Sequence, residues 1–464
     1  MALDTLISKA ALQDAGKPRY LAIADEMTQL VMNGQIPIGE RLPPQRKLAR
    51  ALAVTAGTVS HAYAILEQRG LASARVGDGT YVRAPEGPQA ARLSASPTGL
   101  IDMAHNIAIA TSDAQAMADA LRAIAADTAI LQQVVAYQSE TGHPRHREAG
   151  AQWLRRFGTA GDASRVMVTH GAQHGLACVL RTLARPGDAV LTETLSYPGL
   201  QSLARHMRLQ LVGVDMDEEG MLPDALDQSA RAMGARILFC TPSLHNPTNA
   251  TMSLARREAI ARVARQHHLL VIEDTVHAAA LSTPPPALST WLPEHSFLLS
   301  SFSKVMAPGL RVGYIEAAPQ WLTKFAASMR ADCWMVAPLM PEIATRWLES
   351  GTTQALLNAQ RQRIADRLAL AHRNLAGLDY RSHPESPLLW LPLSEPWQAA
   401  TLAAAARQAG ILVRTPDHFT VGRSATPNAV RLSLNAVSSD AQVDTGLATL
   451  ATILQGAAPF LLDA

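Results

Sequence analysis

The chain has 464 residues, of which 48% are hydrophobic and 17% are charged, and its formal net charge is only +2. The length predicts two or three folding units, and the composition excludes a chain that is disordered throughout. A net charge this small also excludes nucleic-acid binding over the whole surface, so any contact with DNA has to come from a local patch.

Residues from about 18 to 82 are predicted to form three helices and a hairpin. Apolar residues recur at helical spacing over 19–32, and 45–53 is a second short helix. Residues 54–57 are expected to form a tight turn that leads into a third helix over 58–69. A Gly-Asp-Gly run predicts a hairpin turn within 71–82. Two short helices joined by a tight turn can place the second helix in a major groove of DNA.

The exposed face predicted for this unit carries side chains that suit contacts with DNA. Arginine neutralises phosphates, and hydroxyl groups at the start of a helix bond to phosphate oxygens. The candidates are Arg41, Arg46, Thr55, Thr58, Ser60, His61, Arg75 and Gly77. A three-helix packing module with a solvated basic face explains the same pattern, and periodicity alone does not separate the two hypotheses.

The segment PIGERLPPQRKLARALAVTAGTVSHAYAILEQRGL, followed by GDGTYV, resembles the GntR-type winged helix-turn-helix along nearly its full length. The resemblance implies that Arg46, Thr55, Thr58 and Gly77 approach DNA. One departure is the Ala-Gly pair at 56–57, where the family often has an arginine. We therefore expect residues 1–83 to bind a double-stranded DNA operator.

Residues 84–100 are rich in Pro, Ala and Ser, which is the composition of a linker. After it, apolar strands alternate with helical segments, which predicts an α/β fold with a mostly parallel sheet. We expect residues 101–464 to form a large part over about 125–340 and a smaller part over about 341–464. The predicted strands are 166–169, 189–193, 210–214, 236–240, 269–272, 297–300 and 312–316, with one more at 429–435.

Ser301, Ser303, Lys304 and Arg311 lie in one short segment after a predicted strand. A lysine of lowered pKa can form a Schiff base with an aldehyde cofactor, and serine and arginine side chains can hold a phosphate group. By itself this motif is weak, because most lysines simply lie on the surface.

Three further patterns follow strands and offer partners for the same kind of cofactor. Asp274 can pair with a pyridine nitrogen, Asn246 can donate to a phenolic oxygen, and Tyr197 can stack on the ring. A helix cap, a turn and a packing residue are the ordinary explanations for each of them alone. Backbone amides at a helix start can also hold a phosphate group. Those amides belong to Gly171, Ala172 and Gln173.

The order and spacing of these patterns, from about residue 102 onward, resemble the fold-type I pyridoxal-phosphate enzymes of the aspartate aminotransferase class. The resemblance implies that Lys304 is the Schiff-base lysine and that Asp274 is the partner of the pyridinium nitrogen, so these two carry the catalytic roles. It also implies that Asn246 donates a hydrogen bond to the phenolic oxygen of the cofactor, that Tyr197 stacks on the cofactor ring, and that Arg431 binds a substrate carboxylate.

Three residues depart from that family pattern, and the first is His146, which stands where the family usually has a leucine. His277 stands where the family usually has a tyrosine, and we expect it to contact the cofactor in its place. Asn249 stands where the family usually has a glycine. The lysine, the acid and the phosphate arginine are intact, which predicts that pyridoxal 5'-phosphate binds.

A GntR-type domain, a linker and an aminotransferase-like domain together resemble the MocR family of regulators. The resemblance implies a pyridoxal-phosphate-dependent transcription regulator that forms a head-to-tail homodimer. Its effector is expected to be an amine or amino acid, or vitamin B6 itself, sensed through the Lys304 aldimine. Two alternatives stay open: an active aminotransferase with an attached DNA-binding module, and a structural dimerisation domain with a vestigial site.

No charge-free apolar run is long enough to span a bilayer, and the N-terminus lacks a signal-peptide pattern. The three cysteines, Cys178, Cys240 and Cys333, have neither metal nor disulfide spacing. We therefore expect a cytoplasmic protein without a membrane partner or a bound metal.

Overall fold

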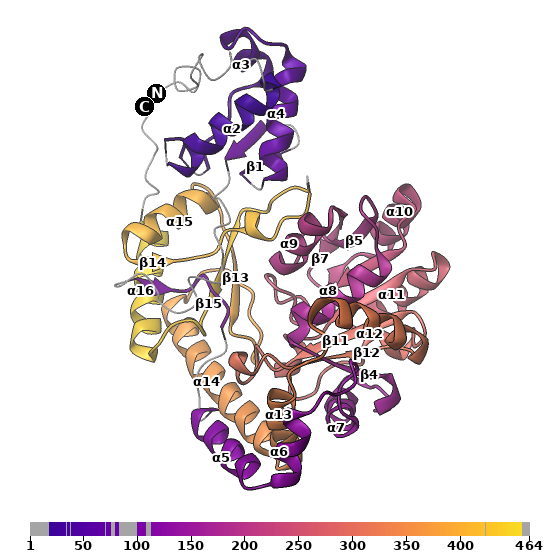
Figure 1. Ribbon diagram of the computed structural model, residues 1–464. Helices are drawn as coiled ribbons and strands as arrows, with labels where there is room; N and C mark the ends of the chain where they lie inside the picture. The colour runs from indigo at the N-terminus through magenta and orange to yellow at the C-terminus, as the bar shows by residue number, and fades with distance from the viewer. Residues whose placement is uncertain are drawn as a thin grey trace. The chain divides into compact units, whose positions relative to one another are not determined.

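The computed structural model describes residues 18–33, 35–37, 39–69, 71–75, 79–82, 100–107, 113–422 and 424–456. Contacts divide the chain into an N-terminal unit, Met1–Gly99 with Arg423–Thr426, and a C-terminal unit, Leu100–Gly422 with Pro427–Ala464 (Figure 1). The predicted linker over 84–100 lies outside the described residues except for Leu100. The predicted boundaries at residues 83 and 100 therefore stay predictions.

The N-terminal unit consists of three helices and an antiparallel hairpin around one apolar core. Its elements are α2 (Arg19–Met32), α3 (Gln45–Ala51), α4 (Ala56–Gln68), β1 (Ala72–Arg75) and β2 (Gly79–Val82). Apolar residues three or four positions apart on α2 and α4 are buried together, as the helical spacing predicted. This core includes Ile23, Met27, Leu48, Val59, Leu66 and Val82.

Two predicted boundaries in this unit were wrong. Helix α4 begins at Ala56 rather than at residue 58, because Thr55 caps it: the Thr55 hydroxyl accepts a hydrogen bond from the Thr58 amide at 3.2 Å. Of the residues assigned to the turn, Ala56 and Gly57 therefore lie in the first turn of the helix. Helix α3 ends at Ala51 rather than at residue 53, since Ala53 has a left-handed φ of 53°.

The C-terminal unit is built on a seven-stranded sheet in the order β4-β12-β11-β10-β9-β5-β6. Only β12 runs antiparallel to its neighbours, so the predicted mostly parallel sheet is confirmed. The strands are β4 (Val166–Thr169), β5 (Ala189–Glu193), β6 (Gln210–Val214), β9 (Ile237–Cys240), β10 (Leu270–Asp274), β11 (Ser296–Ser301) and β12 (Gly313–Glu316).

Helices cover both faces of this sheet, because successive strand residues point to opposite sides. Phe239 on β9 packs into the core that contains residues of α8 (Gly171–Leu183) and α12 (Pro319–Cys333). Its neighbour Leu238 packs into a second core with residues of α10 and α11. The remaining elements near this sheet are α7 (Pro144–Leu154), α9 (Pro198–Met207), β7 (Met216–Asp217), β8 (Gly220–Met221), α10 (Pro223–Met233) and α11 (Leu254–Gln266).

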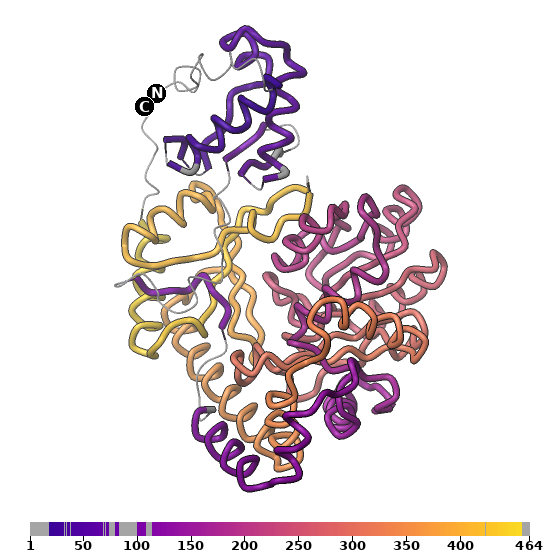
Figure 2. Tube along the Cα trace, in the orientation of Figure 1, coloured from indigo at the N-terminus to yellow at the C-terminus, as the bar shows by residue number. Residues whose placement is uncertain are grey.

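A smaller C-terminal lobe has its own core and takes up the first residues after the predicted linker. Strand β3 (Ile101–Asp102) pairs in parallel with β14 (Ile411–Leu412), and Met103 is buried in this core. Figure 2 shows the purple segment after the linker running within the yellow C-terminal lobe. The core of the lobe begins within α14, since Leu357 belongs to the large core and Ile364 to that of the lobe. Its other elements are α14 (Thr352–Asn374), β13 (Leu388–Pro392), α15 (Ala399–Gln408), β15 (Ala429–Ser433) and α16 (Asp440–Gln455).

Three more helices pack against the large core: α5 (Asp113–Ala125), α6 (Thr128–Val135) and α13 (Leu339–Glu349). Within the described ranges, no helix combines the length and the apolar character needed to cross a membrane.

Candidate cofactor and effector site

The polar residues singled out in the sequence gather at one edge of the seven-stranded sheet. Strand β10 ends at Asp274, and β11 ends at Ser301, directly before the turn that carries Lys304. Gly313, at the start of the antiparallel β12, pairs with both Thr169 and Ser301, so Arg311, two residues before it, comes to the same edge. Ligands of parallel sheets bind at this edge because the strand ends and the following loops meet there.

A cup of serine and arginine side chains lies at the start of α8. Arg311 donates from Nη1 to Ser303 Oγ at 2.9 Å, and Ser303 in turn shares a 3.0 Å hydrogen bond with Ser301 Oγ. Gly171 has a φ of +77°, and a Cβ there would lie 2.9 Å from Arg311 Nη2. Glycine is therefore required for the guanidinium group to reach the helix N-terminus, where the amides of residues 171–173 favour an anion.

Lys304 and Asp274 are near enough to each other for their charges to interact. The Lys304 Nζ donates to the carbonyl of Asn106. Burial, together with the charges of Arg431 and Arg311, lowers the pKa of Lys304 to about 8, although the nearby Asp274 opposes the shift. Burial raises the pKa of Asp274 to about 6. At neutral pH the Asp274 side chain is therefore a carboxylate that can pair with a protonated ring nitrogen.

This pKa predicts how the apoprotein takes up an aldehyde cofactor. Only the neutral amine attacks an aldehyde, and lowering the pKa of Lys304 from 10.5 to about 8 raises its neutral fraction at pH 7. The gain is roughly 300-fold over an ordinary lysine. We expect the rate of pyridoxal-phosphate uptake, followed by visible absorbance, to rise about 20-fold from pH 6.5 to 8.5 and then to level off. N-acetyl-lysine as a control should keep rising through that range, and a flat profile for the protein would contradict the assigned pKa.

Asn246 and Arg431 face the site from its other side. Arg431 is 3% exposed and donates from Nη1 to Asn246 Oδ1 at 3.1 Å and from Nη2 to the carbonyl of Ala104. Its Nε is buried without a hydrogen-bond partner among the described residues. Burial and the charge of Arg414 lower the pKa of Arg431 to about 9, so the side chain remains a cation at neutral pH.

His277 lies next to both cationic residues. The pKa of His277 is lowered to about 3 by burial, by the charges of Lys304 and Arg431, and by His245. Its ring is therefore neutral at physiological pH. A neutral imidazole keeps one N–H donor, as the hydroxyl of a tyrosine would. The predicted contact of His277 with the cofactor stays a prediction.

Tyr197 lies at the start of α9, and burial raises its pKa to about 12. A Cβ on Gly199 would lie 2.3 Å from Cε1 of the Tyr197 ring and 2.4 Å from Oε1 of Gln173. Gly199 is therefore needed for this ring position, and sequence analysis missed it. The available signal was the Tyr-Pro-Gly run, in which the glycine follows the candidate stacking residue directly.

The segment after β3 supplies further contacts that sequence analysis did not predict. The carbonyls of Ala104 and Asn106 accept hydrogen bonds from Arg431 and Lys304, and His105 lies within 3.1 Å of Arg414. No local pattern marks these residues, because the β3–β14 pairing brings them to the site from far away in the sequence.

Asn249 has a physical reason to replace the usual glycine. Its φ is +61°, a left-handed conformation that asparagine tolerates better than most side chains. Its Nδ2 donates to the carbonyl of Leu388 at 2.6 Å, and its Oδ1 accepts from the Ser386 hydroxyl at 2.7 Å. The substitution therefore joins this loop to the C-terminal lobe.

The site as a whole fits an aldehyde cofactor that carries a phosphate group. Such a molecule requires a lysine of lowered pKa, an acid that can pair with the ring nitrogen, and donors for the phosphate. The half-buried Lys304, the carboxylate at the end of β10 and the hydroxyl, guanidinium and backbone groups at the start of α8 meet these requirements. The glycine at position 171 leaves open the cradle that a Cβ would fill. Within the described part of the chain, no group of three or more histidine, cysteine or acidic residues is placed to bind a metal ion.

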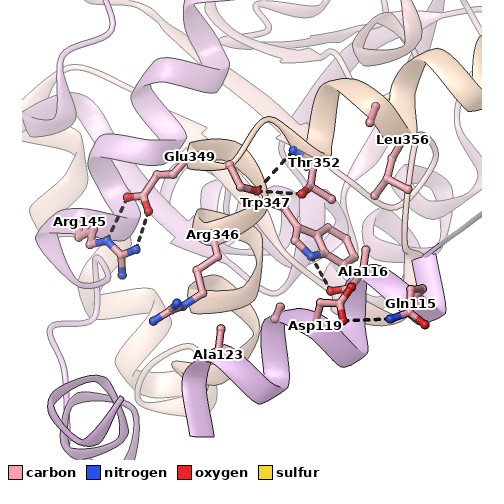
Figure 3. A pocket seen from close by; sticks show the side chains of 13 residues that line it. Gln115, Ala116, Asp119, Ala123, Arg145, Arg346, Trp347, Glu349, Thr352 and Leu356 are labelled. Atoms are coloured by element: carbon pink, nitrogen blue, oxygen red, sulfur yellow. Dashed lines mark hydrogen bonds and ion pairs between the residues drawn. The ribbon is translucent and has the colours of Figure 1, made fainter. Parts of the chain in front are cut away.

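A separate pocket of about 700 Å³ lies between α5 and the α13–α14 segment (Figure 3). Arg145 and Glu349 form an ion pair of 2.5 Å on its wall, and Trp347 donates from Nε1 to the carbonyl of Ala116 at 3.2 Å. None of the residues predicted for the cofactor lines this pocket. Each of its charged side chains already has an ion-pair partner, in the pocket or beside it, so the pocket lacks the free cationic groups that a phosphate needs.

The DNA-binding candidates of the N-terminal unit lie on α3, on α4 and beside the hairpin. The Arg41 side chain lies against Gly79 of the hairpin. If residue 79 had a Cβ atom, that atom would be 2.8 Å from Arg41 Nε. The Thr55 and Thr58 hydroxyls are 2.8 Å apart at the start of α4. The His61 ring meets the Tyr20 ring edge-on at 5.5 Å, which ties it to α2. The exposed candidates are Arg41, Arg46, Thr55, Ser60 and His61.

Two DNA-binding candidates have no described side chain. Arg75 ends strand β1, and its side chain is outside the described part of the structure. Gly77 also lies outside the described residues. Both assignments stay predictions.

Comparisons with known proteins cover both units. The family model "Aminotransferase class I and II" matches residues 100–450, and the model "Bacterial regulatory proteins, gntR family" matches residues 19–82. One relative, the uncharacterized HTH-type transcriptional regulator YdeF of Bacillus subtilis, is 28% identical over 96% of this chain and 96% of its own length. Another, the vitamin B6 salvage pathway transcriptional repressor PtsJ of Salmonella typhimurium, is 27% identical over 91% of this chain and 95% of its own.

A solved structure supports the fold of the C-terminal unit. The kynurenine aminotransferase of Pyrococcus horikoshii has a TM-score of 0.70 and 20% identity, and the match covers 79% of this chain and 96% of that protein. At this level of identity the likeness extends to the fold and not to the substrate.

Proposed function

This chain belongs to the aminotransferase class I and II family and carries a GntR-type domain, and we propose that this transcription regulator senses an amine or amino acid at the Lys304 site. Its cofactor is pyridoxal 5'-phosphate, and its N-terminal unit binds DNA. One observation carries the proposal. One site contains both Lys304, whose lowered pKa makes it reactive toward an aldehyde, and Arg431, a buried arginine whose Nε has no partner among the described residues. The same chain carries a DNA-binding domain.

Each side chain of the site has a distinct part in this proposal. Ser301, Ser303 and Arg311 hold the phosphate group together with the start of α8, and Asp274 holds a proton on the ring nitrogen. When bound, pyridoxal phosphate supplies an aldehyde carbon that amines attack. Lys304 would hold the aldehyde carbon of the cofactor until an effector amine displaces it, and Arg431 would bind the carboxylate of the effector.

The sensing step requires a difference in effector affinity between two states of the protein, because a ligand shifts an equilibrium only by its differential affinity. The contacts of Arg431 and Lys304 with the carbonyls of Ala104 and Asn106 link the site to the β3 segment. That segment follows the linker from the N-terminal unit directly in the sequence. We therefore propose that effector binding changes the position of the β3 segment and thereby the affinity for DNA.

The test measures the visible spectrum and DNA affinity of the loaded protein with a panel of amines and amino acids. DNA selected by the protein from a random library serves as the operator. An amine that changes both the spectrum and the DNA affinity, by about 5-fold or more, supports the proposal. A change in DNA affinity on cofactor loading alone would instead make vitamin B6 the effector. Turnover of an amino acid with a keto acid would favour the aminotransferase alternative.

Arg46 is an exposed residue of α3, and we propose that it contacts a DNA phosphate. Replacing it with alanine should weaken binding about equally for operator and unrelated DNA and lower the salt slope of binding by about 1. Fluorescence anisotropy at several salt concentrations measures both quantities. Arg122→Ala, on α5 of the C-terminal unit, is the matched loss of charge and should leave the slope unchanged. A sequence-dependent loss for Arg46→Ala would assign the residue to base recognition instead.

We also propose a cytoplasmic head-to-tail homodimer. Three exposed apolar residues support a protein interface: Val135 is 83% exposed, Tyr137 is 85% exposed and Trp334 is 55% exposed. The Tyr137 and Trp334 rings contact each other, with centroids 6.4 Å apart. Sedimentation velocity should give the mass of a dimer. Crosslinking between the N-terminal unit of one protomer and the C-terminal unit of its partner should distinguish the head-to-tail arrangement from others.

A further inference from the structure

The C-terminal lobe places a second arginine, Arg414, beside the predicted carboxylate clamp Arg431. We propose that Arg414 is a second cationic residue of the effector site and that the site takes an amine whose carboxylate lies between the two guanidinium groups. This inference rests on the proposed function and specifies the effector as an amino acid rather than a simple amine.

The two arginines are held side by side by the backbone. Arg414 N donates to the Arg431 carbonyl at 3.1 Å, and Arg431 N donates to the Arg414 carbonyl at 2.8 Å, as an antiparallel pair. Side chains of residues directly opposite each other in such a pair lie on the same face. Both guanidinium groups turn to one atom, the carbonyl oxygen of Ala104, which accepts from Arg431 Nη2 and, at 3.4 Å, from Arg414 Nε.

A chain of hydrogen bonds fixes the position of Arg414. Its Nη2 lies 3.1 Å from His105 Nε2, and His105 Nδ1 lies 2.6 Å from Asp102 Oδ2. With the proton on Nδ1 donated to the carboxylate, Nε2 of the neutral ring accepts from the guanidinium group. Asp102 also accepts from the amides of Ala104 and His105 at 2.9 and 3.1 Å. Arg414 is therefore preorganised beside Arg431 before any ligand binds.

At the point where the two guanidinium groups converge, their shared acceptor is a neutral carbonyl and not an anion. The charges of Asp102 and Asp417 attract Arg414, and that of Asp102 also attracts Arg431, but the Asp102 carboxylate is hydrogen-bonded to His105. Burial lowers the pKa of both arginines, and the charge of Arg414 lowers that of Arg431 further. The Nε of Arg431 is buried without a partner among the described residues. A carboxylate supplies the missing charge and an acceptor for the unpartnered donor, which a simple amine does not.

The experiment compares amino acids with the amines that lack only the carboxylate, such as leucine with isoamylamine and alanine with ethylamine. The probes are titrated into pyridoxal-phosphate-loaded protein and followed by the visible spectrum. Arg414→Met should weaken binding of the amino acids by about 10- to 100-fold and leave binding of the amines within about 2-fold. Arg407→Met, which removes an exposed charge on α15 of the same lobe, is the matched control and should change neither. Equal amino-acid affinity in Arg414→Met and the unaltered protein would overturn the proposal.

A second measurement separates failure of this inference from failure of the proposed function. If no amine changes the spectrum of the unaltered protein, the sensing function fails. Thermal shifts with acetate, propionate and succinate then test the carboxylate site alone. These anions should raise the melting temperature of the loaded protein and of Arg407→Met but not of Arg414→Met. An equal rise in Arg414→Met would overturn the inference whatever the effector is. Circular dichroism and the cofactor band check that Arg414→Met is folded.

Discussion

Replacing Lys304 with alanine is expected to abolish the visible absorption band of the loaded protein and its covalent trapping by borohydride. The attachment requires a nucleophilic nitrogen, and in the structure Lys304 Nζ lies beside Asp274 with its pKa lowered to about 8. The cup around Arg311 stays intact in the variant, so the cofactor should still bind non-covalently. We expect its affinity to fall by about 100-fold or more, which corresponds to ~2.7 kcal/mol.

Lys324→Ala is the matched control for this variant. Lys324 is exposed on α12, where its Nζ lies 4.4 Å from the centroid of the Trp321 ring. This control should keep the band, the trapping and the affinity. A band that persists in Lys304→Ala would assign the attachment to another lysine. A colourless unaltered protein would support the vestigial site that the sequence left open.

Replacing Arg311 with methionine is expected to weaken pyridoxal-phosphate binding by about 10- to 100-fold, because charge-assisted hydrogen bonds to the phosphate are lost. The guanidinium group is bound to Ser303 and reaches the start of α8 only because residue 171 is a glycine. Lys304 should still form its covalent bond at saturating cofactor, so the position of the band should be nearly unchanged. Equilibrium dialysis with pyridoxal phosphate measures the affinity.

Two comparisons make the Arg311 result specific to the phosphate group. Pyridoxal, which lacks the phosphate, should bind the unaltered protein and Arg311→Met equally. Arg262→Met removes an exposed charge on α11 and should leave both affinities unchanged. If pyridoxal were affected as strongly as pyridoxal phosphate, Arg311 would act through the fold of the site and not on the phosphate.

Much of the cofactor site could be predicted from the sequence because its residues are local to strand ends. Asp274, Ser301 and Lys304 each end or follow an apolar run that is recognisable as a buried strand, and six of the seven sheet strands run in the same direction. Parallel strands bring their carboxyl ends to one edge, so residues with weak individual signals converge there. The same reasoning gave the position of the DNA-binding helices from apolar spacing, but not the start of α4, which depends on the Thr55 cap.

The sequence by itself thus determined the α/β class from periodicity, and it predicted the two-part organisation. It also singled out the lysine, acid, serine and arginine residues that the structure brings to one edge of the sheet, while their roles toward the cofactor rest on the family resemblance and stay predictions. Only the tertiary structure decided what surrounds Arg431. Strand β3 has two residues and no periodicity, and it pairs with a strand about 300 positions later in the chain. That pairing, together with the backbone pairing of Arg414 with Arg431, brings Ala104, His105 and Arg414 next to Arg431. Contacts between residues so far apart leave no local pattern, because they depend on how the lobe packs and not on neighbouring residues in the chain.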